Sequence, residues 1–256
     1  MIKPGLVSVT FRKKTPAEIV ALVKQAGLEG IEWGGDIHVP HGNLAAAREI
    51  ASMTTDAGLA VAAYGSYYRV GVANQSPFDA IVETASALGA PTIRVWAGNL
   101  SSADADANYR QLVANESRQI ADQAAQAGIS VSFEFHGGTL TDSYESTQSL
   151  IEKIDHPGIR SYWQPPLGSN ERENLTGLRS LLAWLSHVHV FEWHADHTRY
   201  PLIAGTDRWG KYLSVIAPVV GDRYAMLEFA SNDSVEQFLA DATTLLGLIG
   251  NLKDQG

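Results

Sequence analysis

Val131-Ser132-Phe133-Glu134-Phe135-His136 is a short apolar segment that ends in polar groups which an ordinary buried strand would not carry. Burying a carboxylate such as that of Glu134 without a partner costs several kcal/mol. Five further segments repeat the pattern, with the polar or aromatic group toward the C-terminal end: residues 30–33, 92–96, 161–164, 187–193 and 226–229. Together they indicate a parallel sheet whose strand ends converge on one site, which is where a (β/α)8 barrel keeps its chemistry.

Glycines recur where helices are expected to give way to strands. Gly27, Gly58, Gly89 and Gly128 each follow a helix-like segment and precede a strand-like one. Each fits the position just past a helix, where a residue without Cβ takes the left-handed conformation at little cost. Their spacing of 31, 31 and 39 residues is close to the roughly 30 residues per unit of an eight-fold barrel. Thr15-Pro16-Ala17-Glu18 predicts a capping box at the start of the first helix.

These signals predict eight strand–helix units in one domain over residues 1–256. Strands are expected near residues 5–10, 30–33, 59–64, 91–96, 129–135, 159–163, 187–192 and 224–229. Helices are expected near residues 15–26, 44–57, 77–88, 104–127, 143–154, 173–185, 208–217 and 232–249. A doubly wound open sheet is the alternative, but evenly spaced units favour a closed (β/α)8 TIM barrel of the α/β class.

The composition limits the classes of function. The chain carries a formal charge of −9 and has no run of five Lys or Arg residues, so the electrostatic footprint for nucleic acid is missing. It has no cysteine, which excludes disulfides and thiolate metal sites. No segment approaches the length of an apolar membrane span, and the start of the chain does not resemble a signal peptide. We therefore expect a cytoplasmic protein without a nucleic-acid or membrane partner.

Four residues on the last four predicted strands are candidate ligands for one divalent cation: Glu134, Gln164, His189 and Glu228. Neighbouring strands lie about 4.8 Å apart, so their ends can converge on a single ion. Two carboxylates, one imidazole and one amide oxygen favour Mn²⁺, with Mg²⁺, Co²⁺ or Zn²⁺ as alternatives. A cation also removes the repulsion between two nearby glutamates. Two alternatives stay open here, a hydrogen-bonded core role for His189 and a loop-capping role for Gln164.

Further polar and aromatic residues near the strand ends are candidate substrate contacts. Tryptophans offer apolar faces to the C–H side of a sugar, and their alternative role is to plug the barrel mouth. Arg94 can pair with an anionic group or with Glu32, and Arg199 is the loop residue best suited to a carboxylate or phosphate. The predicted contacts are Trp33, His38, Arg94, Trp96, His136, Trp163, Trp193 and Arg199.

The chain resembles the xylose isomerase-like (β/α)8 family of sugar phosphate isomerases and epimerases. The resemblance runs over essentially the whole chain and is most specific at residues 27–33, residues 133–136, Gln164, His189 and residues 227–228. Members of this family usually bind a divalent metal through Glu, Asp, His and Glu on strands five to eight, which implies the four candidate ligands above. Gln164 departs from the usual Asp, and the loss of one negative charge should weaken metal affinity.

The resemblance implies a metal-dependent isomerase or epimerase acting on a sugar or keto-polyol. In such epimerases one glutamate removes the proton next to a carbonyl and the other returns a proton to the opposite face, so Glu134 and Glu228 are the predicted acid/base pair. A dehydratase or lyase of a keto-sugar or inosose is the alternative on the same scaffold, because the same enediolate can expel a β-hydroxyl.

Two other functions are weighed against these enzymes. A DNA repair endonuclease shares the fold but needs several metals and a basic groove, and the acidic chain argues against it. A non-catalytic sugar-binding barrel stays open because of the Gln164 departure. Apolar residues in segment 243–250 either pack on the barrel or support a dimer, so a homodimer or homotetramer stays open.

Overall fold

A computed structural model describes residues 1–73 and 76–253. Its parallel strands form a closed barrel in chain order, in which β1 (Ile2–Val7) pairs with both β2 and β8. The remaining strands are β2 (Gly30–Gly34), β3 (Ala60–Arg69), β4 (Thr92–Trp96), β5 (Ser130–Phe133), β6 (Ile159–Trp163), β7 (Leu185–Val190) and β8 (Arg223–Leu227). The predicted (β/α)8 barrel is confirmed, and the open sheet is wrong.

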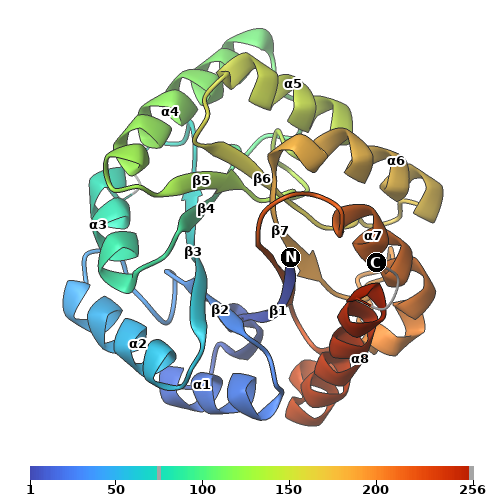
Figure 1. Cartoon of the computed structure of the whole chain (residues 1–256). Coiled ribbons are helices and arrows are strands. Elements are labelled where there is room, and N and C mark those ends of the chain that lie inside the picture. Colours follow the sequence, from blue (N-terminus) through green and yellow to red (C-terminus); the bar gives the residue numbers. More distant parts are fainter. Residues whose placement is uncertain (74–75, 254–256) are drawn as a thin grey trace.

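A ring of helices surrounds the strands (Figure 1). These helices are α1 (Pro16–Gln25), α2 (Leu44–Asp56), α3 (Phe78–Leu88), α4 (Ala107–Gln126), α5 (Tyr144–Ile154), α6 (Glu171–Leu181), α7 (Thr206–Ile216) and α8 (Val235–Lys253). Short 3₁₀ turns supplement them at η1 (Ser8–Phe11), η2 (Leu182–Trp184), η3 (Leu202–Gly205) and η4 (Ser231–Asp233). Within the described part of the chain, no helix combines the length and the apolar character needed to cross a membrane.

The local signals behave as predicted. The four junction glycines, Gly27, Gly58, Gly89 and Gly128, have φ values of 70°, 81°, 75° and 70°, in the left-handed region that favours glycine. At the start of α1 the Thr15 side chain accepts a hydrogen bond from the Glu18 backbone N–H while the Glu18 side chain accepts from the Thr15 backbone, which completes the capping box. These junctions therefore set the length of each repeating unit.

The first strand lies earlier than predicted. The sequence pattern placed it at residues 5–10, whereas β1 ends at Val7 and the next residues form η1. In η1 the Ser8 hydroxyl accepts from the Gly34 backbone N–H at 2.9 Å, and the Thr10 hydroxyl accepts from the Phe229 N–H at 3.1 Å. The two hydroxyls thus bind the backbone at the last residue of β2 and just after β8, and the turn that presents them ends the first strand.

Alternation along the strands divides the side chains between two layers. A small buried cluster that includes Val7, Ala62, Tyr162 and Met226 fills the inside of the barrel. A much larger buried cluster packs between the strands and the helices. Polar side chains that point into the barrel at the C-terminal strand ends therefore lie next to this small apolar cluster.

Close packing between α5 and α6 depends on a glycine. A Cβ at Gly177 would lie 2.1 Å from the nearest atom of the Tyr144 ring, whose hydroxyl donates to Asn174 at 3.0 Å. We expect Gly177→Ala to lower the free energy of unfolding by about 1–3 kcal/mol, because the overpacked ring must shift. Chemical denaturation measures the change. The control is Gly247→Ala in α8, where the new methyl group is exposed and meets nothing within 4 Å. This variant should raise the free energy of unfolding by about 0.5–1 kcal/mol, because alanine favours the helix. Equal stabilities of the two variants would contradict the prediction.

Candidate active site

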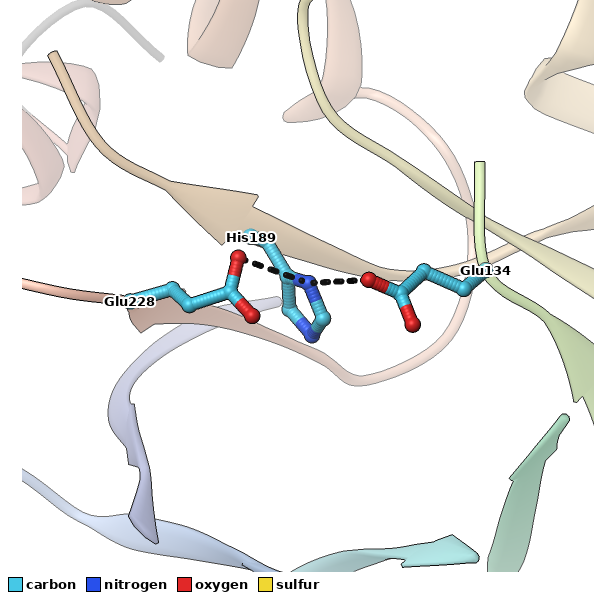
Figure 2. A group of neighbouring side chains, drawn as sticks. All are labelled: Glu134, His189 and Glu228. Atoms are coloured by element: carbon cyan, nitrogen blue, oxygen red, sulfur yellow. Dashed lines mark ion pairs between the residues drawn. The ribbon is translucent and has the colours of Figure 1, made fainter. Parts of the chain in front are cut away.

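Two glutamates and a histidine from three strands meet in the barrel mouth (Figure 2). Glu134 directly follows β5, His189 lies in β7 and Glu228 directly follows β8. Nδ1 of His189 is 3.4 Å from Oε2 of Glu228 and 3.8 Å from Oε1 of Glu134. The backbone N–H groups of the two glutamates still donate to the neighbouring strands, at Val95 and Val190. The side chains are therefore held by the barrel itself, and all three are buried.

Gln164 brings a fourth polar group to the same point. It directly follows β6, and its Oε1 atom lies 3.0 Å from Nδ1 of His189. One ring nitrogen thus faces three oxygens, from Glu134, Gln164 and Glu228. The four ligands predicted from the sequence converge in the structure.

A buried ion-pair network lies behind the histidine. Nε2 of His189 is 3.6 Å from Oε2 of Glu32, which comes from β2 across the barrel. Glu32 also accepts a hydrogen bond from Nε of Arg94 at 2.7 Å, and Nη1 of Arg94 binds Oε2 of Glu134. Arg94 was a predicted substrate contact with pairing to Glu32 as its alternative, and the structure shows the ion pair.

The network holds more negative than positive charge. Glu32, Glu134 and Glu228 supply three carboxylates and Arg94 supplies one guanidinium, so the fixed charge is −2 when His189 is neutral. Burial disfavours a charged imidazole, but Glu228 and Glu32 together raise the pKa of His189 to about 10. Burial likewise disfavours the Glu228 carboxylate, yet the charge and hydrogen bond of His189 lower its pKa. Protonation of His189 therefore neutralises one of the two excess negative charges.

The donor set fits a divalent cation. Ligand atoms that share a small divalent ion at about 2.1 Å lie roughly 3.0–3.4 Å apart, and three oxygens lie 3.0–3.8 Å from Nδ1 of His189. A charge of +2 at this point balances the carboxylate excess. Within the described residues, Nε2 of His189 and Oε2 of Glu32 are buried atoms without a hydrogen-bond partner, as expected if the ring turns its second nitrogen to the carboxylate when Nδ1 binds an ion. Oxygen ligands with one imidazole suit Mn²⁺ or Mg²⁺.

Trp96 and His136 line the mouth on the β4 and β5 side. Nε1 of Trp96 donates to Oε2 of Glu134, and the His136 ring stacks on the indole with centroids 4.7 Å apart. The Arg69 guanidinium lies 3.8 Å from the centroid of the same indole, and the Tyr67 ring packs against it at 5.7 Å. The sequence pattern ended the third strand near residue 64, whereas β3 continues to Arg69, with Tyr67 at a φ of 58°. No sequence signal marks that left-handed tyrosine.

Trp193 and Arg199 lie across the barrel, beyond β7. The Arg199 guanidinium is 5.2 Å from the Trp193 ring centroid and 4.7 Å from that of Phe229. It also forms an ion pair of 2.7 Å with Asp233. A substrate anion would therefore compete with Asp233 for this arginine.

Three predicted contacts lie elsewhere, which corrects the sequence prediction. Trp33 and Trp163 are fully buried on the helix-facing side, where their indole N–H groups donate to Thr54 at 3.2 Å and to Tyr144 at 3.3 Å. The reason is strand alternation, since the neighbouring residues on β2 and β6 point into the barrel. His38 is buried against Trp33, with Nδ1 3.0 Å from the Ser8 hydroxyl, and burial lowers its pKa.

Comparison with known proteins agrees with this architecture. A family model described as a xylose isomerase-like TIM barrel matches residues 20–237. A 3-dehydroshikimate dehydratase of Bacillus anthracis is 27% identical over 208 residues, which cover 73% of this chain and 71% of that protein. The crystal structure of the probable 3-DHS dehydratase AsbF, involved in petrobactin synthesis in Bacillus anthracis, has a TM-score of 0.81 at 22% identity and covers 95% of this chain and 98% of its own. The 3-keto-D-glucoside 4-epimerase YcjR from E. coli has a TM-score of 0.74 at 17% identity, with coverage of 96% and 99%.

Proposed function

The chain belongs to the xylose isomerase-like TIM barrel family, and from this premise we propose that it is a divalent-metal-dependent dehydratase of a small hydroxylated ketone. The sequence alone ranked isomerisation or epimerisation first and dehydration second. A relative at 27% identity that is named a dehydratase supports the reverse order. The observation that carries the proposal is the buried cluster of Glu134, Gln164, His189 and Glu228, with its excess of negative charge.

These four side chains would hold the ion, with Mn²⁺ or Mg²⁺ as the best match to the donor set. When bound, the ion supplies positive charge for the substrate oxygens and stabilises the negative charge that develops when a neighbouring C–H proton leaves. Trp96 and Trp193, on opposite sides of the mouth, would pack against the substrate and exclude water.

The two glutamates have unlike surroundings, and this asymmetry favours elimination over epimerisation. Oε2 of Glu134 is occupied by two N–H donors, from Arg94 and Trp96. Glu228 contacts His189 through Oε2, and we assign proton transfer to its other oxygen, Oε1. An epimerase needs two groups that exchange protons with opposite faces of one carbon, whereas elimination can use one carboxylate.

Glu228 can serve both halves of the elimination. Its carboxylate takes the proton from the carbon next to the carbonyl. The C=C bond forms as the C–O bond to the β-hydroxyl breaks, and the same carboxyl gives its proton to the departing hydroxyl. The products are water and an unsaturated ketone, and Glu228 returns to its starting form. Glu134 then acts as a ligand whose orientation Arg94 and Trp96 hold.

Turnover of 3-dehydroshikimate tests the proposal. We expect the Mn²⁺-loaded protein to convert it with loss of water, seen as the rise in near-ultraviolet absorbance of a newly conjugated carbonyl. Chelation should abolish the reaction, and added Mn²⁺ should restore it, because the fixed charges alone repel a developing anion.

A 4-epimerase shares the fold, so epimerisation is the second candidate, and it predicts a different result. Recovered ketose substrates would carry solvent deuterium at an inverted carbon, without any gain in absorbance. Failure to bind a metal, combined with ligand affinity that chelation leaves unchanged, would contradict both enzymes and support the sugar-binding barrel.

A further inference from the structure

We infer that Glu32 is a positioning residue that holds the His189 ring so that Nδ1 faces the three oxygens of the metal site. The inference deepens the proposed function and rests on it, because it concerns the same site. Glu32 lies on β2, which pairs with none of the strands that carry the candidate ligands, and none of the four ligand positions includes it.

The first observation is a matched pair of unsatisfied atoms. Oε2 of Glu32 and Nε2 of His189 are 3.6 Å apart, and both side chains are fully buried. Each of the two atoms lacks a hydrogen-bond partner within the described residues. A proton on Nε2 would point at the carboxylate and leave the lone pair of Nδ1 directed toward Glu134, Gln164 and Glu228. A carboxylate behind a metal-binding imidazole commonly fixes the ring and its tautomer in this way.

The second observation is that the carboxylate is itself held in place. Nε of Arg94 donates to Oε1 of Glu32 at 2.7 Å, and the same guanidinium binds Glu134. Arg94 therefore links the residue behind the histidine to one of the ligands. The Tyr162 ring packs edge-on against His189, with centroids 5.0 Å apart, and limits rotation of the imidazole from below.

The third observation is that the backbone leaves room for this ion pair. A Cβ at Gly65 of β3 would lie 2.7 Å from Nη2 of Arg94 and 2.8 Å from Oε1 of Glu32. Any side chain at this position would push the guanidinium and the carboxylate out of place. Glycine at position 65 therefore leaves the space that the Arg94–Glu32 ion pair occupies.

A purely structural role for Glu32 makes a different prediction. If Glu32 only neutralised Arg94, its replacement would change the stability of the metal-free protein and leave metal affinity unchanged. If it acted only through its charge, a shorter side chain with the same charge would bind metal as well as the wild type. Positioning requires both the charge and the length of the side chain.

The experiment compares Glu32→Gln, which keeps the length, with Glu32→Asp, which keeps the charge. The matched control is Glu29→Gln, the same change at an exposed residue just before β2. Calorimetric titration of each metal-free protein with Mn²⁺ gives the affinity, thermal unfolding of the metal-free form gives the stability, and the visible spectrum of the Co²⁺ form reports the ligand geometry. We expect both Glu32 variants to bind Mn²⁺ about 10–100-fold more weakly and to shift the Co²⁺ spectrum, while the control matches the wild type.

The outcomes separate the inference from the proposed function. Wild-type Mn²⁺ affinity and an unchanged Co²⁺ spectrum in Glu32→Gln would overturn the inference, and so would wild-type affinity in Glu32→Asp. If Glu32→Gln does not fold, the Glu32→Asp titration still decides. Absence of Mn²⁺ binding by the wild type would instead overturn the proposed function.

Discussion

Glu228→Gln is expected to lower kcat of the metal-loaded protein by about 10²–10⁴-fold, because the variant keeps the shape of the side chain but removes the proton acceptor. The carboxylate is buried, and a divalent cation bound beside it would favour the ionised form, which can take a proton. Glu134→Gln should reduce kcat to a similar degree for a different reason. The side-chain amide introduced by this substitution would bind a metal ion more weakly than the carboxylate. It would also bind the N–H groups of Arg94 and Trp96 more weakly.

Two measurements distinguish these causes. In Glu228→Gln, bound Mn²⁺ should remain detectable while exchange of the substrate α-proton with solvent deuterium is lost. In Glu134→Gln, activity should recover in part at high Mn²⁺ concentration. Glu236→Gln, the same change on an exposed residue of α8, serves as the control and should retain full activity. Near-normal turnover by Glu228→Gln would remove the assigned base and the elimination mechanism with it.

The convergence of Glu134 and Glu228 was predictable from the sequence, because a carboxylate at the end of an apolar strand needs a partner. The helix–strand junctions were predictable for an equally local reason, since Gly27 and Gly58 mark the end of a helix wherever the chain then goes. Such signals depend on the residue and its immediate neighbours, and the barrel follows from repeating them.

Whether a strand-end side chain points into the barrel or toward the helices was not predictable in the same way. Glu32 and Trp33 both stand at the end of β2, and strand alternation sends one into the barrel and the other toward α2. A shift of one residue would exchange them, and the short apolar segment gives no signal for the choice. The Glu32–His189 contact was missed because it joins β2 to β7, which are not neighbours in the barrel.

Arg94→Met is expected to lower the free energy of unfolding of the metal-free protein by about 3–5 kcal/mol, because it leaves Glu32 and Glu134 buried without their shared counter-charge. Only 1% of the Arg94 side chain is exposed, and it pairs with both carboxylates at once. Methionine has a similar length and keeps the apolar contacts of the stem. The loss therefore measures the charge and not the packing.

Chemical denaturation of Arg94→Met, of the double variant Arg94→Met/Glu32→Gln and of the exposed control Arg48→Met tests this prediction. The double variant should regain part of the lost stability, because it removes one of the two stranded carboxylates. The control should stay within about 0.5 kcal/mol of the wild type. Mn²⁺ should also raise the Tm of Arg94→Met more than that of the wild type, since the excess charge around His189 grows from −2 to −3. An Arg94→Met protein as stable as the wild type would mean that the carboxylates are not held as a charged group, and the electrostatic reason for a divalent cation in this barrel would be lost.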